Sequence, residues 1–93
     1  MTIHWLIPNA QKKDIEPILV TLQPGAKTET DLPHMGEEFG YVLSGAVTLE
    51  LGGKNYRVRK GDSFSFKPSQ QHDLKNTGKT PATVLWVCTP PNF

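Results

Sequence analysis

The chain has 93 residues, with ten basic and nine acidic side chains, a formal charge of +1 and an isoelectric point near 7.9. A chain of this length can enclose one hydrophobic core, so residues 1–93 are expected to form a single domain. The near-neutral charge argues against a nucleic-acid-binding surface, which carries a strong excess of basic residues. Cys88 is the single cysteine, and neither a signal pattern nor a long apolar run is found. These features predict a soluble cytoplasmic domain with no membrane contact.

Apolar residues recur with period two in short runs, and turn-forming residues separate the runs. The first two predicted strands cover 3–7 and 18–22. Further strands are predicted at 39–43, 46–51, 54–58, 63–66 and 82–88, with a short one around 72–74. Gly52-Gly53 suits a two-residue hairpin. This pattern predicts an all-β sandwich or barrel, in which residues 1–16 form an N-terminal strand and link, 17–88 the barrel and 89–93 an extended tail.

Three polar side chains are candidates for one site: His34, Glu38 and His72. On an extended strand His34 and Glu38 would stand roughly 13 Å apart. We therefore expect Gly36 to form a turn or bulge that brings them together. His72 is distant in sequence, and only a closed barrel can bring it to the other two. Two imidazoles and a carboxylate suit a divalent ion such as zinc, iron, manganese or nickel.

A second interpretation fits the residue types of this cluster equally well. Each histidine would cap a loop hydrogen bond, and Glu37-Glu38 would be a solvated acidic pair. The sequence contains no Ser-His-Asp grouping, phosphate-binding glycine loop or CxxC pair. No catalytic residue is assigned.

The aromatic residues divide between core and pocket. Aromatic side chains on period-two strands are usually core, so Trp5 and Phe64 are assigned there. Phe66 and Trp86 lie near the polar cluster and are expected to form the wall of a ligand pocket.

If Glu38 points inward, alternation turns Phe39, Tyr41 and Leu43 outward. A monomer would expose this apolar stripe, so a homodimer face is predicted there. The alternative is a second bulge that turns some of these side chains inward.

Two segments of the chain resemble the paired motifs of the cupin family. Residues 25–45 resemble the first motif, a glycine, a His-x-His pair, a glutamate and a second glycine. Residues 61–76 (GDSFSFKPSQQHDLKN) resemble the second motif. The resemblance implies a small jelly-roll β-barrel. The matching residues are His34, Glu38, Gly45, Pro68, His72 and Asn76.

The chain departs from the cupin pattern at two positions. Leu32 stands where the first histidine of the His-x-His pair is expected, and Gln70 where a glycine is expected. Leucine cannot coordinate a metal, so the resemblance implies at most three protein ligands. These are His34, Glu38 and His72. Asp31 is a substitute if the loop after Gly25, which is one residue longer than in the cupin motif, turns it inward.

A narrower resemblance concerns the runs HMGEEFGYVLSG, GDSFSF and PATVLWVCTPPNF. They are similar to the C-terminal sensor domain of bacterial regulators that join a helix-turn-helix domain to a cupin. This implies a small-molecule effector held by His34, Glu38, His72, Phe66 and Trp86, a homodimer, and DNA contact only through a separate domain. The alternatives are a stand-alone metal-dependent oxygenase or isomerase, and a structural dimerisation module.

Overall fold

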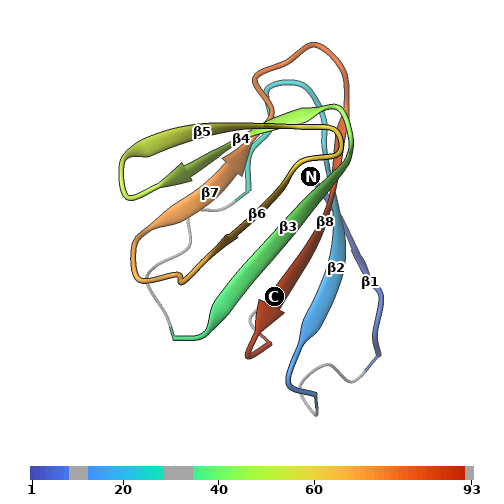
Figure 1. The fold of residues 1–93 in the computed structure, drawn as a ribbon. Coiled ribbons are helices and arrows are strands. Elements are labelled where there is room, and N and C mark those ends of the chain that lie inside the picture. The colour runs from blue at the N-terminus through green and yellow to red at the C-terminus, as the bar shows by residue number, and fades with distance from the viewer. Residues whose placement is uncertain (9–12, 29–34, 92–93) are drawn as a thin grey trace.

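Two antiparallel sheets face each other in a computed structural model that describes residues 1–8, 13–28 and 35–91 (Figure 1). The larger sheet has the strand order β1-β2-β8-β3-β6, and the smaller has the order β5-β4-β7. The strands are β1 (Thr2–Trp5), β2 (Glu16–Leu22), β3 (Glu37–Ser44), β4 (Ala46–Leu51), β5 (Lys54–Arg59), β6 (Ser63–Phe66), β7 (His72–Lys75) and β8 (Ala82–Thr89). Each predicted strand is present, which confirms the all-β, jelly-roll class.

The core lies between the sheets because each long strand alternates apolar inward residues with outward ones. In β2 and β8 this alternation is unbroken from end to end. No helix among the described residues has the length and hydropathy needed to cross a membrane. The buried apolar residues are Ile18, Val20, Leu22, Val42, Val47, Leu49, Val58, Leu74, Ala82, Val84, Trp86 and Cys88.

The strand β3 alternates inward and outward residues from Glu38 to Leu43. Glu38 and Val42 are buried, whereas Phe39, Tyr41 and Leu43 are 40%, 37% and 42% exposed. A register shift against β8 occurs between Val42 and Ser44, beyond the stripe's first two residues. The predicted outward stripe is therefore confirmed, and the bulge does not turn it inward.

The assignment of Trp5 to the core is wrong. Its side chain is 51% exposed, although its strand pairs with β2 opposite Ile18. The strand β1 is the edge of its sheet, so no further strand covers this residue. Phe64 does pack against the core, as predicted, and remains partly exposed.

Asn76 holds the end of β7 against the opposite sheet. Its Nδ2 donates to the carbonyls of Leu22 (2.9 Å) and Thr80 (2.8 Å), and its Oδ1 accepts from the Gly78 amide (2.9 Å). The side chain is buried with these donors and acceptor paired. These hydrogen bonds hold the loop after β7 closed, which explains why an asparagine occupies this position of the second motif.

Candidate functional site

Glu38 and His72 form a buried ion pair between the two sheets. Glu38 lies on β3 in the larger sheet, and His72 begins β7 in the smaller one. The distance from Glu38 Oε2 to His72 Nε2 is 2.7 Å, and both side chains are fully shielded from solvent. Two of the three predicted site residues are therefore brought together across the barrel. Neither is a solvated surface group, although the neighbouring Glu37 is exposed.

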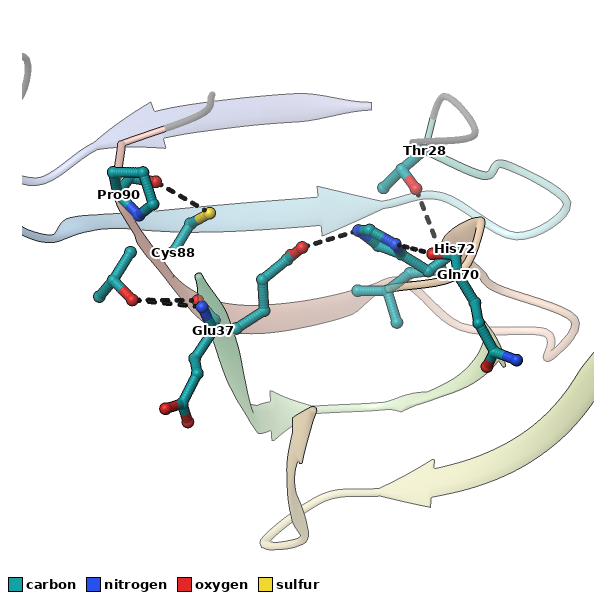
Figure 2. Close-up of polar contacts among 9 residues, drawn as sticks. Thr28, Glu37, Gln70, His72, Cys88 and Pro90 are labelled. Atoms are coloured by element: carbon teal, nitrogen blue, oxygen red, sulfur yellow. Dashed lines mark hydrogen bonds and ion pairs between the residues drawn. The ribbon is translucent and has the colours of Figure 1, made fainter. Parts of the chain in front are cut away.

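The backbone before His72 fixes the orientation of its ring. His72 Nδ1 lies 2.9 Å from the carbonyl oxygen of Gln70, and this contact and the ion pair are drawn in Figure 2. A carbonyl oxygen can only accept, so Nδ1 carries a proton. The other nitrogen, Nε2, faces the Glu38 carboxyl group. The ring can hold a second proton there as imidazolium, or direct a lone pair at an ion.

The surroundings of the pair are mostly apolar. Glu38 pairs in register with Phe66 on one side and with Cys88 on the other. The Phe66 ring lies 5.0 Å from the His72 ring, centroid to centroid, in an edge arrangement. Cys88 Sγ contacts the Pro90 carbonyl at 3.3 Å. Charges interact more strongly in such a setting than in water, which favours a pair over two isolated ions.

Gly40, the next inward residue of β3 after Glu38, makes room for the aromatic side chains around the pair. Gly40 lies between Trp86 and Phe64 in the strand register. A Cβ atom on Gly40 would overlap three atoms of the Phe64 ring. The missing side chain lets Phe64 lie across β3, where its ring meets Trp86 edge-on at 6.4 Å and stacks with Phe66 at 6.1 Å. This aromatic set positions Phe66 against His72.

A cavity of about 540 Å³ opens between the edge strands β5 and β6. Phe66 belongs both to this cavity and to the surroundings of His72. Trp86 is 2% exposed and lies in the hydrophobic core, behind Phe64. The cavity is lined by Leu49, Leu51, Tyr56, Arg57, Val58, Asp62, Ser63, Phe64, Ser65 and Phe66.

A smaller cavity, of about 210 Å³, reaches His72 from the other side. It is lined by His72, by two acidic residues, Glu50 and Asp73, and by the β4–β5 hairpin glycines and Gln71. Phe66 therefore separates the pair from the larger cavity, and His72 borders the smaller one.

The described donors fall short of a complete metal site. His34, Asp31 and Leu32 lie outside the described residues, and within residues 1–8, 13–28 and 35–91 no group of three or more His, Cys, Asp or Glu is placed to hold an ion. Glu38 and His72 supply two donors, whereas catalytic zinc commonly has three protein ligands. The Nδ1 contact to Gln70 is nonetheless of the kind that a metal-binding histidine makes, donating its other ring N–H to a backbone carbonyl.

Gly36 adopts the conformation expected of it. Its φ is +104°, directly before β3 begins at Glu37, and a Cβ atom there would overlap the Thr89 carbonyl. Sequence reasoning did not find the Gln70 carbonyl, because a backbone acceptor leaves no trace in residue identity. It also missed that Cys88 is next to Glu38, which follows only from the register of β3 and β8.

A two-sheet barrel with an acidic residue and a histidine paired across its interior belongs to the small jelly-roll class. Residues 18–88 match the family model described as "Cupin domain", and the chain belongs to the cupin family. It is 33% identical over 76 residues to the HTH-type transcriptional regulator PuuR of Escherichia coli. That match covers 82% of this chain and 41% of the regulator, so the chain spans about two fifths of its relative.

Solved structures agree with this family. The Cupin_2 domain of an XRE family transcriptional regulator from Enterobacter cloacae superposes with a TM-score of 0.85 at 19% identity, covering 98% of this chain and 97% of that one. An HTH_3 family transcriptional regulator from Vibrio cholerae gives 0.82 at 22% identity, covering 97% and 51%. The fold is thus that of cupin domains found in helix-turn-helix transcription regulators.

Proposed function

We propose that this chain is the small-molecule-sensing domain of a transcription regulator. The effector would place a polar end at Glu38 and His72, with His34 as a third contact, and its apolar part in the cavity beside Phe66. Contact with DNA would belong to a helix-turn-helix segment of a longer protein. The similarity to PuuR, of which this chain spans 41%, supports that division of labour.

The observation that carries the proposal is the buried Glu38–His72 pair behind Phe66, which lines the 540 Å³ cavity. Ligand sites are concave, mostly apolar and supplied with a few converging polar groups. Burying a carboxylate and an imidazole costs stability that apolar residues would avoid. A binding role accounts for that cost, because both groups are then available to a ligand that displaces their mutual contact.

A divalent ion would be held at the same place. His72 Nε2 and Glu38 Oε2 would be its ligands, with His34 supplying a third, and zinc, iron, manganese and nickel are the candidates. The ion would supply positive charge to orient an oxygen atom of the effector. Trp86 would act behind Phe64 by holding the aromatic wall in place.

Native mass spectrometry of the purified chain tests this function. We expect a co-purified small molecule, or zinc after titration with zinc chloride, to be retained by the wild type and by Glu37→Gln, and to be lost from Glu38→Gln. Glu37→Gln is the matched control, since Glu37 is the exposed neighbour of the buried Glu38. Circular dichroism would first establish that each variant is folded. Equal retention by both variants, or no retention by the wild type, would contradict the proposal.

The second candidate function is a metal-dependent enzyme. One solved relative is described as a "sugar phosphate isomerase from a cupin superfamily", from Silicibacter pomeroyi, and is 32% identical with a TM-score of 0.74, covering 83% of this chain and 51% of that one. Stoichiometric iron, nickel or manganese in the wild type, lost in His72→Ala, together with turnover of a sugar phosphate, would favour this function. A chain that binds no ligand or ion at all would be a structural module.

A further inference from the structure

The side chain of Gln70 lies on the hairpin that joins β4 and β5. A Cβ atom built on Gly52 would stand 2.5 Å from both Cδ and Oε1 of Gln70, and 2.8 Å from Nε2. The amide group of Gln70 therefore occupies the space that any side chain at position 52 would need. Gly52 has a φ of +58° and Gly53 a φ of +83°, as the two-residue hairpin turn requires. Gly52 thus serves both the turn and the contact with Gln70.

The main chain of the same residue holds the ring of His72. The Gln70 carbonyl oxygen lies 2.9 Å from His72 Nδ1 (Figure 2). Gln70 belongs to the link between β6 and β7, outside both strands, so strand pairing does not set the direction of its carbonyl group. A backbone hydrogen bond of 2.9 Å, from the Gly52 amide to the Gln71 carbonyl, ties this link to the hairpin. The position of the Gln70 carbonyl must therefore come from contacts of the link itself.

We propose that Gln70 is a positioning residue for the Glu38–His72 pair. Its amide group packs on Gly52 and holds the link against the hairpin, so that its carbonyl meets Nδ1 and Nε2 is directed at Glu38. A glycine, which the cupin motif has at this position, could not make the contact and would give the link more backbone freedom. The role rests on the proposed function only where it concerns an effector or ion at Nε2, because the ring orientation does not depend on that function.

The hairpin is a firm support for this contact. Its strands β4 and β5 have six residues each and pair along their whole length. The strand β7 joins the same sheet with His72 opposite Leu51. Gly52, the next residue, therefore lies one position beyond the pairing that places His72. Gly52, Gly53 and His72 all line the 210 Å³ cavity, so the contact lies at the border of a space that reaches the ring.

Exchange of the His72 Nδ1 proton with water, followed by NMR, tests the inference. A ring that keeps its bond to the Gln70 carbonyl exchanges this proton slowly, whereas a mobile ring exposes it. We expect Gln70→Ala to raise the exchange rate by at least about tenfold, and Gln70→Met, which keeps the length of the side chain, to stay within about threefold of the wild type. Gln71→Ala is the matched control, because Gln71 is the exposed neighbour in the same link and should leave the rate unchanged.

The two hairpin glycines give a second comparison. Gly52→Ala and Gly53→Ala both place a side chain at a positive φ and should cost similar strain. A methyl group at position 52 meets the Gln70 amide, whereas a Cβ atom on Gly53 has no heavy atom of the described residues within 4 Å beyond its chain neighbours. We expect Gly52→Ala to raise the exchange rate and Gly53→Ala to leave it unchanged. The double variant Gly52→Ala/Gln70→Ala should exchange no faster than Gln70→Ala, since both changes act through one contact.

Several results would overturn the inference. They are an Nδ1 proton that exchanges too fast to be observed in the wild type, a Gln70→Ala variant that exchanges at the wild-type rate, or equal acceleration in the two glutamine variants or in the two glycine variants. Urea unfolding and the amide exchange of the core residue Val84 separate a loose ring from a general loss of stability. If Gly52→Ala does not fold, the Gln70 and Gln71 variants decide the inference alone. A wild type that retains neither zinc nor a small molecule would contradict the proposed function and would leave the exchange comparison unaffected.

Discussion

At the scale of single residues, the central feature is a carboxyl group and an imidazole that share one proton site inside an apolar barrel. The Gln70 carbonyl fixes the proton on Nδ1 of His72, so all exchange of ligand, ion or proton must occur at Nε2. Glu38 and His72 have no exposed side-chain surface. Each therefore makes its polar contacts inside the protein, and those of His72 include the Gln70 carbonyl.

Removing one partner of this pair should be more harmful than removing both. We expect Glu38→Leu to destabilise the fold by about 3–5 kcal/mol, because it leaves a buried imidazole without its carboxylate. The double variant Glu38→Leu/His72→Leu should recover most of that loss, since neither charged member of the pair is then left buried without the other. Urea unfolding measures all three proteins. Additive losses in the double variant would show that the two residues act independently.

The outer surface of the smaller sheet offers a second prediction, on pH dependence. The Lys75 ammonium lies 2.6 Å from the Glu50 carboxylate, and its hydrogen bond and charge lower the pKa of Glu50. The same contact raises the pKa of Lys75. A lowered carboxyl pKa contributes stability that is present above the unfolded-state pKa, about 4.3 for glutamate, and is lost as the pH falls through the folded value.

In Lys75→Met the pKa of Glu50 should therefore rise, as measured by NMR titration of its side-chain carboxyl carbon. Stability should also fall less steeply in the variant below about pH 4.3, because less depends on keeping Glu50 ionised. Lys60→Met, at an exposed turn position, is the control and should leave the Glu50 titration unchanged. An unaltered Glu50 titration in Lys75→Met would refute the coupling. The effect on stability should be small, since the pair is accessible to solvent.

At the scale of strands, β3 carries the site because it presents three different kinds of residue inward. Glu38 supplies the charge, Gly40 supplies space for the Phe64 ring, and Val42 joins the core. The neighbouring β6 pairs with β3 so that Phe64 and Phe66 fall opposite Gly40 and Glu38. The arrangement of Phe64 and Phe66 thus depends on Gly40 having no side chain.

We expect Gly40→Ala to displace Phe64 and to destabilise the fold by about 1–3 kcal/mol, as overpacking does. Urea unfolding measures the loss, and the fluorescence of Trp86 reports the displaced ring when Trp5 is replaced by phenylalanine. The double variant Gly40→Ala/Phe64→Leu should regain part of the stability, because the smaller side chain makes room for the methyl group. A Gly40→Ala variant as stable as the wild type would refute the role given to this glycine.

Strand periodicity allowed the elements to be predicted well, because inward and outward residues alternate so regularly in β2, β3 and β8. It was misleading for Trp5, since alternation indicates which side a residue faces but not whether another strand covers it. The closeness of Glu38 and His72 was expected as part of a cluster with His34, because a closed barrel brings these distant residues together; His34 itself lies outside the described residues. The cavity between β5 and β6 was not predicted, because its volume depends on the distance between two sheet edges.

At the scale of the whole molecule, the barrel is asymmetric. One sheet has a charged outer surface and the other an apolar one, while the polar pair joins the two sheets through the core. The proposed effector site therefore lies on the inner side of the larger sheet, opposite the outward residues Phe39, Tyr41 and Leu43. In the proposed regulator, a helix-turn-helix segment would be attached to this asymmetric body.

The alternation of β3 has a thermodynamic consequence. Glu38 faces the interior and Phe39 faces outward from adjacent positions of one backbone, so a ligand that shifts this strand also shifts the predicted homodimer stripe of Phe39, Tyr41 and Leu43. Linkage is reciprocal: if an effector changes the association constant of two chains by some factor, association changes the effector's affinity by the same factor. Subunit concentration would then set the effector level at which the domain responds.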